Sequence, residues 1–233
     1  FLANISHELR TPMHHILNYS KFGIEKLDKP KEKLGHYFAQ IRKTSVRLMF
    51  LLNELLDLSK LESGKMDYTM EKYDLIAIIE DSAEELSSIA QEKGVTIELP
   101  ENTGASLVTC DIYKIGQVVR NLLSNSIKFT APGKHIAVSV SDGILTNEKG
   151  KIAAIKVSVI DQGIGIPSDE IKLVFEKFVQ GSLTKTGAGG TGLGLAICQR
   201  IIEDHNGRIW AAQNPDGGAI FNFLIPYAQE LVE

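Results

Sequence analysis

The sequence predicts an α+β protein, an antiparallel helical hairpin followed by an α/β sandwich. Three observations support this prediction. Apolar residues recur at helical spacing through residues 1–61, Gly64 then ends that pattern, and short alternating patterns typical of strands mix with helix patterns over the rest of the chain. We therefore expect two domains, over residues 1–64 and 65–233.

Composition limits what the chain can do. With 233 residues, of which 43% are hydrophobic, it is long enough for one large or two small globular domains. The net charge of −4 provides no basic field, so we do not expect nucleic acid as a partner. Cys110 and Cys198 lie apart from any metal-ligand spacing, which argues against zinc or a disulfide and favours a reducing compartment, the cytoplasm.

No apolar run reaches the ~18 residues that a membrane span needs, so we expect no membrane segment in this chain. The chain starts without a Met and inside a helix pattern, so we expect a fragment of a longer protein. A membrane anchor in the remainder, which would hold the full-length protein at the inner face of the plasma membrane, is left open.

The first predicted helix runs from the start of the chain to about Asp28. Its apolar or small residues alternate spacings of three and four, at Leu2, Ser6, Leu9, Met13, Ile16, Ser20, Gly23 and Leu27. At about 100° per residue, His7 points away from this seam, beside Glu8 and one turn before Thr11. Pro12 cannot donate to the Glu8 carbonyl, so we expect the helix to bend next to His7. By itself, this arrangement is also compatible with a solvated helix face.

A second helix is predicted over residues 31–61, after a polar turn that contains Pro30. It is roughly 30 residues, or about 45 Å, long, and its apolar stripe is broad. Two helices cannot bury such stripes against each other alone, so we predict a homodimer in which two hairpins form a four-helix bundle. The C-terminal domain folded onto the hairpin is the alternative.

In the second domain, strand and helix patterns alternate. We predict strands over residues 66–73, 95–99, 106–110, 135–141, 152–160 and 221–225. Helices are predicted over residues 75–93, 112–130, 169–178 and 192–206, and residues 147–150 read as a hairpin tip. Several strands are joined by hairpins, which favours a largely antiparallel sheet.

The predicted helix over residues 112–130 carries a polar face. Its members, spaced four, four and three residues apart, are Gln117, Asn121, Asn125 and Lys128. Asn is a poor helix former, so two of them in mid-helix suggest a role beyond folding. An amide oxygen suits Mg²⁺, and an ammonium group one turn further on can hold phosphate oxygens. The spacing therefore predicts a magnesium and phosphate site, with a solvated polar stripe as the alternative.

Two glycine-rich segments suggest contacts to a nucleotide. Asp161 follows a buried strand and can accept a hydrogen bond from an exocyclic amine, while Gly163 and Gly165 leave room for a flat ring. A simple turn is the alternative there. Residues 187–194 are dense in glycine and precede a helix, so backbone amides and the positive end of that helix could hold phosphate. The Walker lysine arrangement is absent.

Five segments resemble the signature boxes of sensor histidine kinases, in the order found in that family. They are the phosphoacceptor box at residues 1–12 (FLANISHELRTP), the N-box at 121–130 (NLLSNSIKFT), the first glycine box at 161–167 (DQGIGIP), the second at 187–197 (GAGGTGLGLAI) and, more weakly, the last at 217–223. The resemblance implies a Bergerat-type ATP-binding domain that uses ATP and Mg²⁺. It also implies phosphorylation of His7 and transfer of the phosphoryl group to an aspartate of a response regulator, as in two-component signal transduction.

The resemblance assigns roles to single residues. Asn125 would bind Mg²⁺, Asn121 would lie at the phosphates, and Lys128 would neutralise them. Asp161 would read the adenine amino group. The ATP-binding set that it implies comprises Asn121, Asn125, Lys128, Phe129, Asp161, Gly163, Gly165, Ile166, Gly190, Thr191, Gly192, Leu193 and Gly194.

For catalysis, His7 would be the nucleophile, and Glu8 would orient its ring or accept its proton. Thr11 matches the position that bifunctional relatives use to orient water when they dephosphorylate the regulator. The chain departs from the usual pattern at Ser126, where Ala is more common, and at Ala219, where Ser or Thr is.

Two other classes of protein remain open, a non-catalytic dimeric scaffold and a GHKL-type ATPase such as a chaperone or topoisomerase domain. Four intact residues argue against the scaffold, namely His7, Glu8, Asn125 and Asp161. The ATPase needs a glutamate as base on the N-box helix, where this chain has Asn121.

Overall fold

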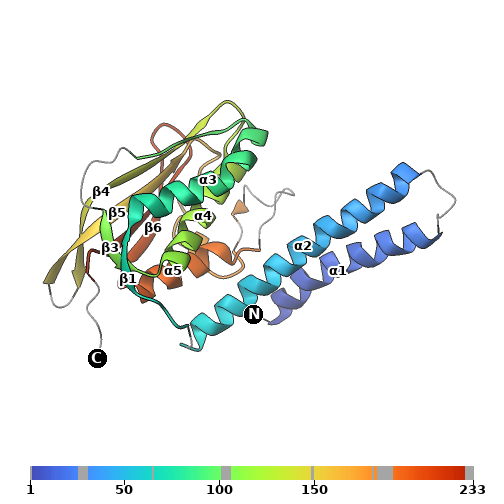
Figure 1. The fold of residues 1–233 in the computed structure, drawn as a ribbon, viewed down its shortest axis with the longest axis horizontal. Helices are drawn as coiled ribbons and strands as arrows, with labels where there is room; N and C mark the ends of the chain where they lie inside the picture. The colour runs from blue at the N-terminus through green and yellow to red at the C-terminus, as the bar shows by residue number, and fades with distance from the viewer. Residues whose placement is uncertain are drawn as a thin grey trace. The chain divides into compact units, whose positions relative to one another are not determined.

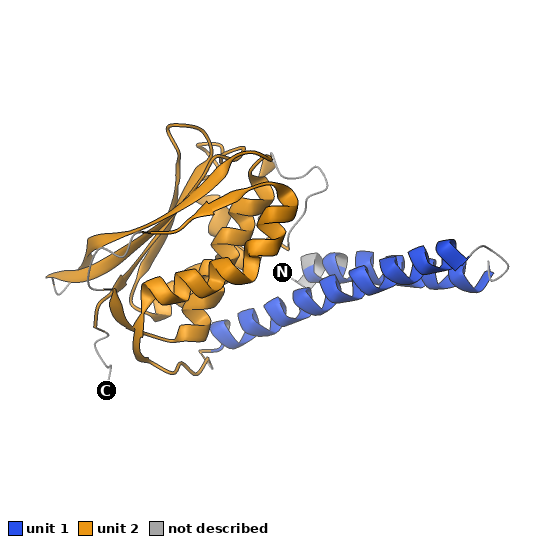
Figure 2. Cartoon of the chain, turned by 45° about the horizontal axis from the view of Figure 1, so that its top comes forward, with its two compact units in different colours: residues 1–63 blue, residues 64–233 orange. Residues whose placement is uncertain are grey.

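The computed structural model describes residues 2–25, 31–64, 66–100, 106–147, 150–179, 181–182 and 191–228. The chain divides into two compact units, Phe1–Ser63 and Gly64–Glu233 (Figure 2). The first unit is a helical hairpin and the second combines strands with helices, which confirms the predicted fold class. The predicted turn around Pro30 lies outside the described residues, as does the side chain of His7.

The first unit consists of helices α1 (Leu2–Glu25) and α2 (Lys31–Glu62), which pack side by side (Figure 1). Aromatic rings join the two helices, since the ring centroid of Tyr37 lies 6.1 Å from that of Tyr19 and 6.2 Å from that of Phe22. α1 continues as one helix through the buried Pro12. Because proline lacks an amide hydrogen, α1 forgoes one of its backbone hydrogen bonds at this point.

The second unit contains a two-stranded ribbon, a five-stranded sheet and three α-helices within the ranges that the structure describes. In chain order its elements are β1 (Glu71–Asp74), α3 (Leu75–Lys93), β2 (Thr96–Glu98), β3 (Leu107–Cys110), α4 (Ile112–Phe129), β4 (His135–Asn147), β5 (Gly150–Asp161), the 3-10 helix η1 (Leu173–Phe175), α5 (Gly194–Asp204), β6 (Arg208–Gln213) and β7 (Ala219–Pro226).

The five-stranded sheet has the order β2-β4-β5-β7-β6. β2 runs parallel to β4, and every other pair of neighbours is antiparallel, which confirms the prediction of a largely antiparallel sheet. β1 and β3 form the separate antiparallel ribbon. Helices α3, α4 and α5 lie together on one face of the five-stranded sheet (Figure 1). The unit therefore has one layer of strands and one layer of helices.

The core of this unit lies between the two layers. Val157 and Val159 of β5 are fully buried, as is Phe223 of β7, which lies opposite Val157. α4 contributes the fully buried Val118 and Leu122 from its apolar side. The predicted polar face of α4 lies on another side of the helix, and its members are half-buried, namely Gln117, Asn121, Asn125 and Lys128. One helix thus contributes both to the core and to the face on which a ligand site was predicted.

Side chains outside the helices fix where α3 and α4 begin. The Asp74 carboxylate accepts a hydrogen bond from the Ile76 amide (2.9 Å), and the Asp111 carboxylate accepts from the amides of Tyr113 and Lys114 (3.0 Å each). Both aspartates are N-caps, which satisfy amides that have no partner within the helix. The two helices consequently start at the residues predicted from the sequence.

Two predicted elements differ from the structure, and one strand is missing from the prediction. Residues 169–178 form turns and η1 rather than a helix, because the chain becomes extended at Glu176 (ψ 146°) and Phe178 has a φ of 62°. Of the strand predicted over 66–73, residues 66–70 stay outside the ribbon. β6 is not among the predicted strands, since the adjacent Ala211-Ala212 weakens the strand pattern.

A buried histidine joins the end of α5 to the start of α4. The imidazole of His205 is fully buried, and its Nε2 accepts a hydrogen bond from the Asp111 amide (3.0 Å). Its Nδ1 lies 2.7 Å from the Ile201 carbonyl oxygen and therefore donates to it. Both nitrogens are used by a neutral ring, and burial lowers the pKa of His205 below its ordinary value.

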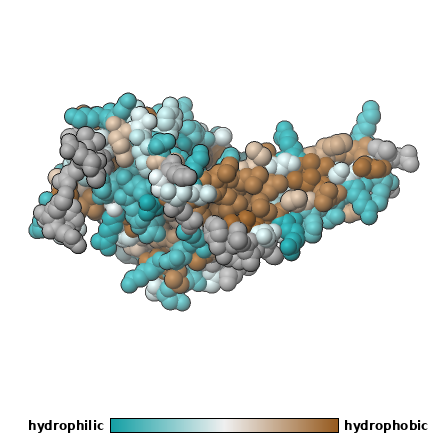
Figure 3. Space-filling model, turned by 90° about the horizontal axis from the view of Figure 1, so that it is seen from below, coloured by the Kyte–Doolittle hydropathy of each residue, from teal (hydrophilic) through white to brown (hydrophobic). Residues whose placement is uncertain are grey.

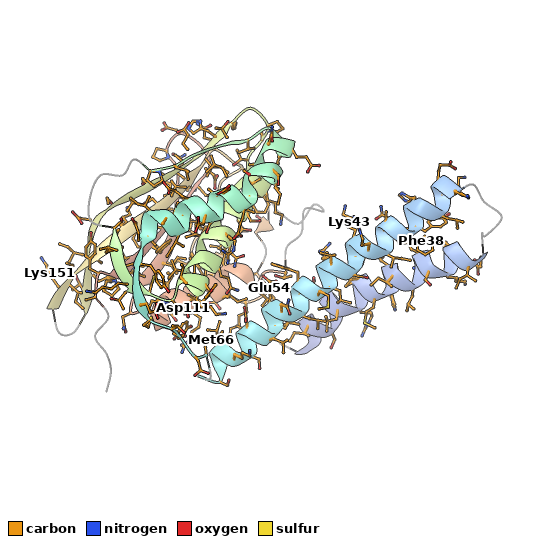
Figure 4. All side chains as sticks on the ribbon, viewed as in Figure 1. Phe38, Lys43, Glu54, Met66, Asp111 and Lys151 are labelled. Atoms are coloured by element: carbon orange, nitrogen blue, oxygen red, sulfur yellow. The ribbon has the colours of Figure 1, made fainter. Side chains whose placement is uncertain are left out.

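Residues 66–70 are held against this same junction. The Thr69 amide donates to the carboxylate of Asp111 (2.9 Å), which Figure 4 labels at the start of α4. The Tyr68 ring packs edge-on against His205 (centroids 5.1 Å apart), and its hydroxyl donates to Asp204 (2.7 Å). Side-chain contacts rather than strand pairing therefore position this segment.

We expect the stability of the second unit to fall in mild acid through His205. The folded state binds fewer protons than the unfolded state below the ordinary His pKa of about 6.5, so the free energy of unfolding drops as pH falls through that value, by up to about 1.4 kcal/mol between pH 7.5 and 5.5. Urea unfolding followed by the fluorescence of Trp210, the only tryptophan, measures this loss. The unfolding free energy of His205→Gln should fall less over the same pH range. If its pH dependence equals that of the unmodified chain, His205 is not the group responsible.

Candidate functional site

The candidate site is organised around the carboxylate of Asp161, the last residue of β5. Asp161 is only 3% exposed. Its Oδ1 accepts hydrogen bonds from the amides of Gly163 (2.9 Å) and Ala219 (3.0 Å), and its Oδ2 accepts one from the Ser126 hydroxyl (3.3 Å). The Asn214 amide group donates to the Asp161 carbonyl (2.9 Å), which holds the main chain as well. Four parts of the chain therefore converge on this residue.

Two opposing effects act on the pKa of Asp161. Burial raises it, because the charged form loses hydration, while the hydrogen bonds from Ala219, Gly163 and Ser126 lower it. Burial dominates, so the pKa lies above the ordinary value for Asp. A buried carboxylate held by donors on both oxygens is a directional acceptor for a further donor, such as an amine.

Glycines allow the main chain to pack closely around Asp161. A Cβ atom on Gly163 would lie 2.7 Å from the carbonyl oxygen of Phe129, at the end of α4. A Cβ atom on Gly218 would overlap the Asp161 carbonyl, and one on Gly165 would lie 3.2 Å from the Gly218 carbonyl oxygen. Gly165 and Gly218 also have positive φ values of 74° and 105°, which favour glycine. The glycines of two predicted boxes are thus in direct contact.

A second group of predicted residues lies where α4 meets the start of α5. The Asn121 side-chain amide donates to the Gly194 carbonyl (3.4 Å) and lies 3.6 Å from the Cys198 sulfur. The Thr191 hydroxyl oxygen accepts from the amide of the buried Leu193 (3.2 Å). The first amides of α5 have no partner within the helix, and this end of its dipole is positive. This end of α5 is therefore suited to an anion.

Gly192 packs tightly against the segment after η1. Its carbonyl accepts a hydrogen bond from the Phe178 amide (2.8 Å), and a Cβ atom at this position would lie 2.8 Å from the Phe178 main chain. Gly190 and residues 183–189 lie outside the described residues.

Asn125 lies between these two groups along α4, and Lys128 lies two residues beyond Ser126; both are half-buried. The Lys128 ammonium group is 4.7 Å from the centroid of the Phe129 ring, a cation–π distance. The Ile166 carbonyl accepts from the Gln213 side chain (3.1 Å), so its contact in this structure is with β6. Among the described residues, no three His, Cys, Asp or Glu side chains come together as a metal site.

The structure adds Lys93, which the sequence analysis does not single out. Its ammonium group donates to the carbonyls of Ile127 (2.6 Å) and Lys128, in the last turn of α4. Partial burial lowers its pKa, but the contact with helix carbonyls suits a cation. A lysine at the end of an amphipathic helix is usually exposed to solvent. The sequence therefore does not distinguish Lys93 from an ordinary surface lysine.

In the first unit, the predicted catalytic residues lie on α1. His7 is part of the helix, Glu8 is half-buried and Thr11 is exposed. They belong to a separate compact unit from Asp161. Of the helices in the described ranges, none is long and apolar enough to cross a bilayer.

Comparison with known proteins gives two family matches. The model of the histidine kinase-, DNA gyrase B- and HSP90-like ATPase family matches residues 110–229. The model of the His Kinase A (phospho-acceptor) domain matches residues 1–64.

Among curated relatives, the sensor protein GacS of Pseudomonas syringae pv. syringae is 33% identical over 99% of this chain and 25% of its own length. The sensor histidine kinase WalK of Bacillus subtilis is 31% identical over 99% of this chain and 37% of its own length. The chain thus spans between a quarter and little more than a third of these relatives.

Solved structures share the fold. The histidine kinase AdeS of Acinetobacter baumannii superposes with a TM-score of 0.71 at 24% identity, over 95% of this chain and 98% of that one. Full-length ShkA, solved in complex with AMPPNP, superposes with a TM-score of 0.69 at 26% identity, over 98% of this chain and 46% of that one.

A phospho-acceptor domain over residues 1–64, followed by an ATPase-type domain over residues 110–229, defines the class of protein as a kinase-family core that joins these two domains in one chain. The chain belongs to the histidine kinases of two-component systems.

The close approach at Gly218 gives a stability prediction with a matched control. Gly217 and Gly218 both have positive φ, but a Cβ atom on Gly217 would meet nothing within 4 Å. Gly217→Ala should cost about 1–3 kcal/mol from backbone strain alone, and Gly218→Ala about 1–3 kcal/mol more from overlap with Asp161. If urea unfolding shows equal losses of unfolding free energy in the two variants, the close packing of Gly218 against Asp161 does not contribute to stability.

Proposed function

We propose that the chain phosphorylates His7 with ATP and then passes the phosphoryl group to an aspartate of a response regulator. In this proposal residues 1–64 serve dimerisation and phosphotransfer, and residues 65–233 bind ATP. The observation that carries it is the buried Asp161 carboxylate, enclosed by glycines in an ATPase-type fold, in a chain whose first 64 residues match a phospho-acceptor domain. We expect the reaction to take place in the cytoplasm, where ATP is available.

In the proposed complex, ATP extends along α4. The adenine amine donates to Asp161, and the phosphates face the amides at the start of α5. Asn121 and Ser126 are five residues apart, about 7.5 Å along a helix, so the two groups of the site lie on one rigid element. The solved ShkA complex with AMPPNP supports ATP as the nucleotide.

Mg²⁺ would be bound by the Asn125 side chain together with nucleotide and water oxygens, as is common for this ion. Its chemistry would be to neutralise the phosphate charge during transfer. Lys128 adds a positive charge one turn further along α4, and it would exchange its contact with Phe129 for phosphate oxygens. Gly163, Gly165 and Ile166 would line the adenine, while Gly190, Thr191, Gly192, Leu193 and Gly194 would surround the phosphates.

Phosphorylation requires the neutral imidazole of His7. The lone pair of one ring nitrogen forms the N–P bond while the bond from the γ-phosphorus to the bridging oxygen breaks, and ADP leaves with that oxygen. The other ring nitrogen then releases a proton, which Glu8 accepts or directs to solvent. With an ordinary His pKa near 6.5, neutral imidazole is the main form at physiological pH.

Thr11 would have a separate role after transfer. Its exposed hydroxyl lies one turn from His7 on α1, where it would orient a water molecule toward the phosphorylated aspartate of the regulator. Glu8 would then serve kinase chemistry and Thr11 phosphatase chemistry.

Exposed apolar side chains on the hairpin support a dimer. Hydrophobic residues gather along the two helices in Figure 3. On α1 the exposed members include Met13 (51%), Leu17 (62%) and Ile24 (69%), which share one side of the helix. A second hairpin packed on this stripe would complete a four-helix bundle.

The experiment that tests the function incubates the chain with Mg²⁺ and γ-labelled ATP. The protein should acquire an acid-labile, base-stable label that His7→Gln reduces at least about 100-fold, since it removes the nucleophile. His14→Gln is the matched control, because His14 is exposed two turns further along the same side of α1, and it should retain the label. Phosphate release without labelled protein would instead indicate an ATPase.

For the dimer, we expect Leu17→Glu to convert the chain to a monomer in light scattering, because it places a charge in the proposed interface. Asn18→Glu adds the same charge at the neighbouring exposed position and should leave the dimer intact. A concentration-independent monomer mass for the unmodified chain would rule the dimer out.

A further inference from the structure

Ser126 places a hydroxyl group beside the nucleobase site. Its side chain is 1% exposed and lies on α4, one residue after Asn125. Its hydroxyl donates to Oδ2 of Asp161 at 3.3 Å. Alanine, the residue more usual at this position in the family, would remove this hydrogen bond without changing the helix.

The hydrogen bonds of Asp161 show which oxygen remains able to accept another donor. Each carboxylate oxygen has two favourable acceptor positions. Oδ1 uses both, for the amides of Gly163 and Ala219. Oδ2 uses one of its positions, for Ser126, so its second position is the one at which an exocyclic amine can bind.

Ser126 also affects the charge of Asp161. The groups that perturb this carboxylate are all neutral donors, the Ser126 hydroxyl from α4, the Gly163 amide from the loop after β5 and the Ala219 amide from β7. On the β4 side, its partner is the apolar Ile136. In the described part of the chain, no charged side chain perturbs it, so these donors alone oppose the effect of burial.

We propose that Ser126 is a positioning residue for base recognition, which orients Oδ2 of Asp161 toward the exocyclic amine and extends adenine nucleotide binding to lower pH. A protonated Asp161 would present an O–H group where an acceptor is needed, and the amine would lose its partner. This inference rests on the proposed function, because it requires Asp161 to contact the base.

The first experiment measures nucleotide affinity by calorimetry on the whole chain with Mg²⁺ at pH 7.5. ATP is compared with purine riboside triphosphate, which has the same ring and phosphates but no amine. Ser126→Ala should weaken ATP binding about ten-fold, the low end of the effect of a hydrogen bond to a charged group. The affinity for the analogue, which has no amine to contact Asp161, should change less than about three-fold. Equal losses for both nucleotides would mean that Ser126 acts only on the structure and would overturn the proposal.

The second experiment follows the ratio of the two affinities between pH 5 and 8. Protonation of the triphosphate is common to both nucleotides and cancels in the ratio. The preference for ATP should fall in acid, and in Ser126→Ala this fall should begin at higher pH, by about one unit for a ten-fold effect. If the affinity ratio has the same pH dependence in the unmodified chain and in Ser126→Ala, Ser126 has no role in the ionisation of Asp161.

Two further variants separate the possible outcomes. Ser126→Thr keeps the hydroxyl and should restore the preference for ATP. In Asp161→Asn the carboxylate is absent, so adding Ser126→Ala should cause no further selective loss of ATP; a selective loss there would overturn the proposal. If the unmodified chain fails to bind ATP at all, the proposed function fails instead.

Discussion

The burial of one carboxylate, Asp161, is the constraint on which the second unit depends. An ionised group at 3% exposure is unfavourable unless donors replace water. Those donors come from α4, from the loop after β5 and from the start of β7, so the carboxylate is satisfied only when the helix layer and two antiparallel strands are in register. Gly163 and Gly218 make the required approach possible, because a side chain on either would collide with the main chain. The contacts proposed to recognise the ligand are therefore also the contacts that the fold needs.

α4 connects the parts of this unit. Its first turn is held by Asp111, its last turn by Lys93, and its apolar side by the core. Because neighbouring elements hold both ends, the residues between them have little freedom to shift along the helix axis. The spacing between the Asn121 contact with α5 and the Ser126 contact with Asp161 is consequently fixed by helix geometry. A ligand that bridges both contacts meets a rigid surface.

Periodicity was sufficient to predict most helices and the sheet type, because the core of the second unit alternates regularly and Asp74 and Asp111 mark helix starts. It failed at residues 169–178, where Phe178 takes a positive φ that the sequence does not signal. Local sequence also predicts Asp161 as a site residue, and this stays a prediction. The contact between Lys93 and α4 was not predicted from the sequence, because its partners are main-chain carbonyls about 35 residues away. Every residue has the same backbone carbonyl, so a contact with one cannot be predicted from the amino-acid sequence.

Tyr68 and Thr69 are hydrogen-bonded to Asp204 and Asp111, and these contacts have a mechanical consequence. Only three residues separate Gly64, the first residue of the second unit, from Tyr68, and a chain extends at most about 3.6 Å per residue. The connection can therefore span at most roughly 14 Å. A pull on α2 that extends the connection fully is delivered to Asp111 and Asp204, at the start of α4 and the end of α5, rather than to the sheet. The two helices that would contact ATP are thus the first to bear load from the hairpin.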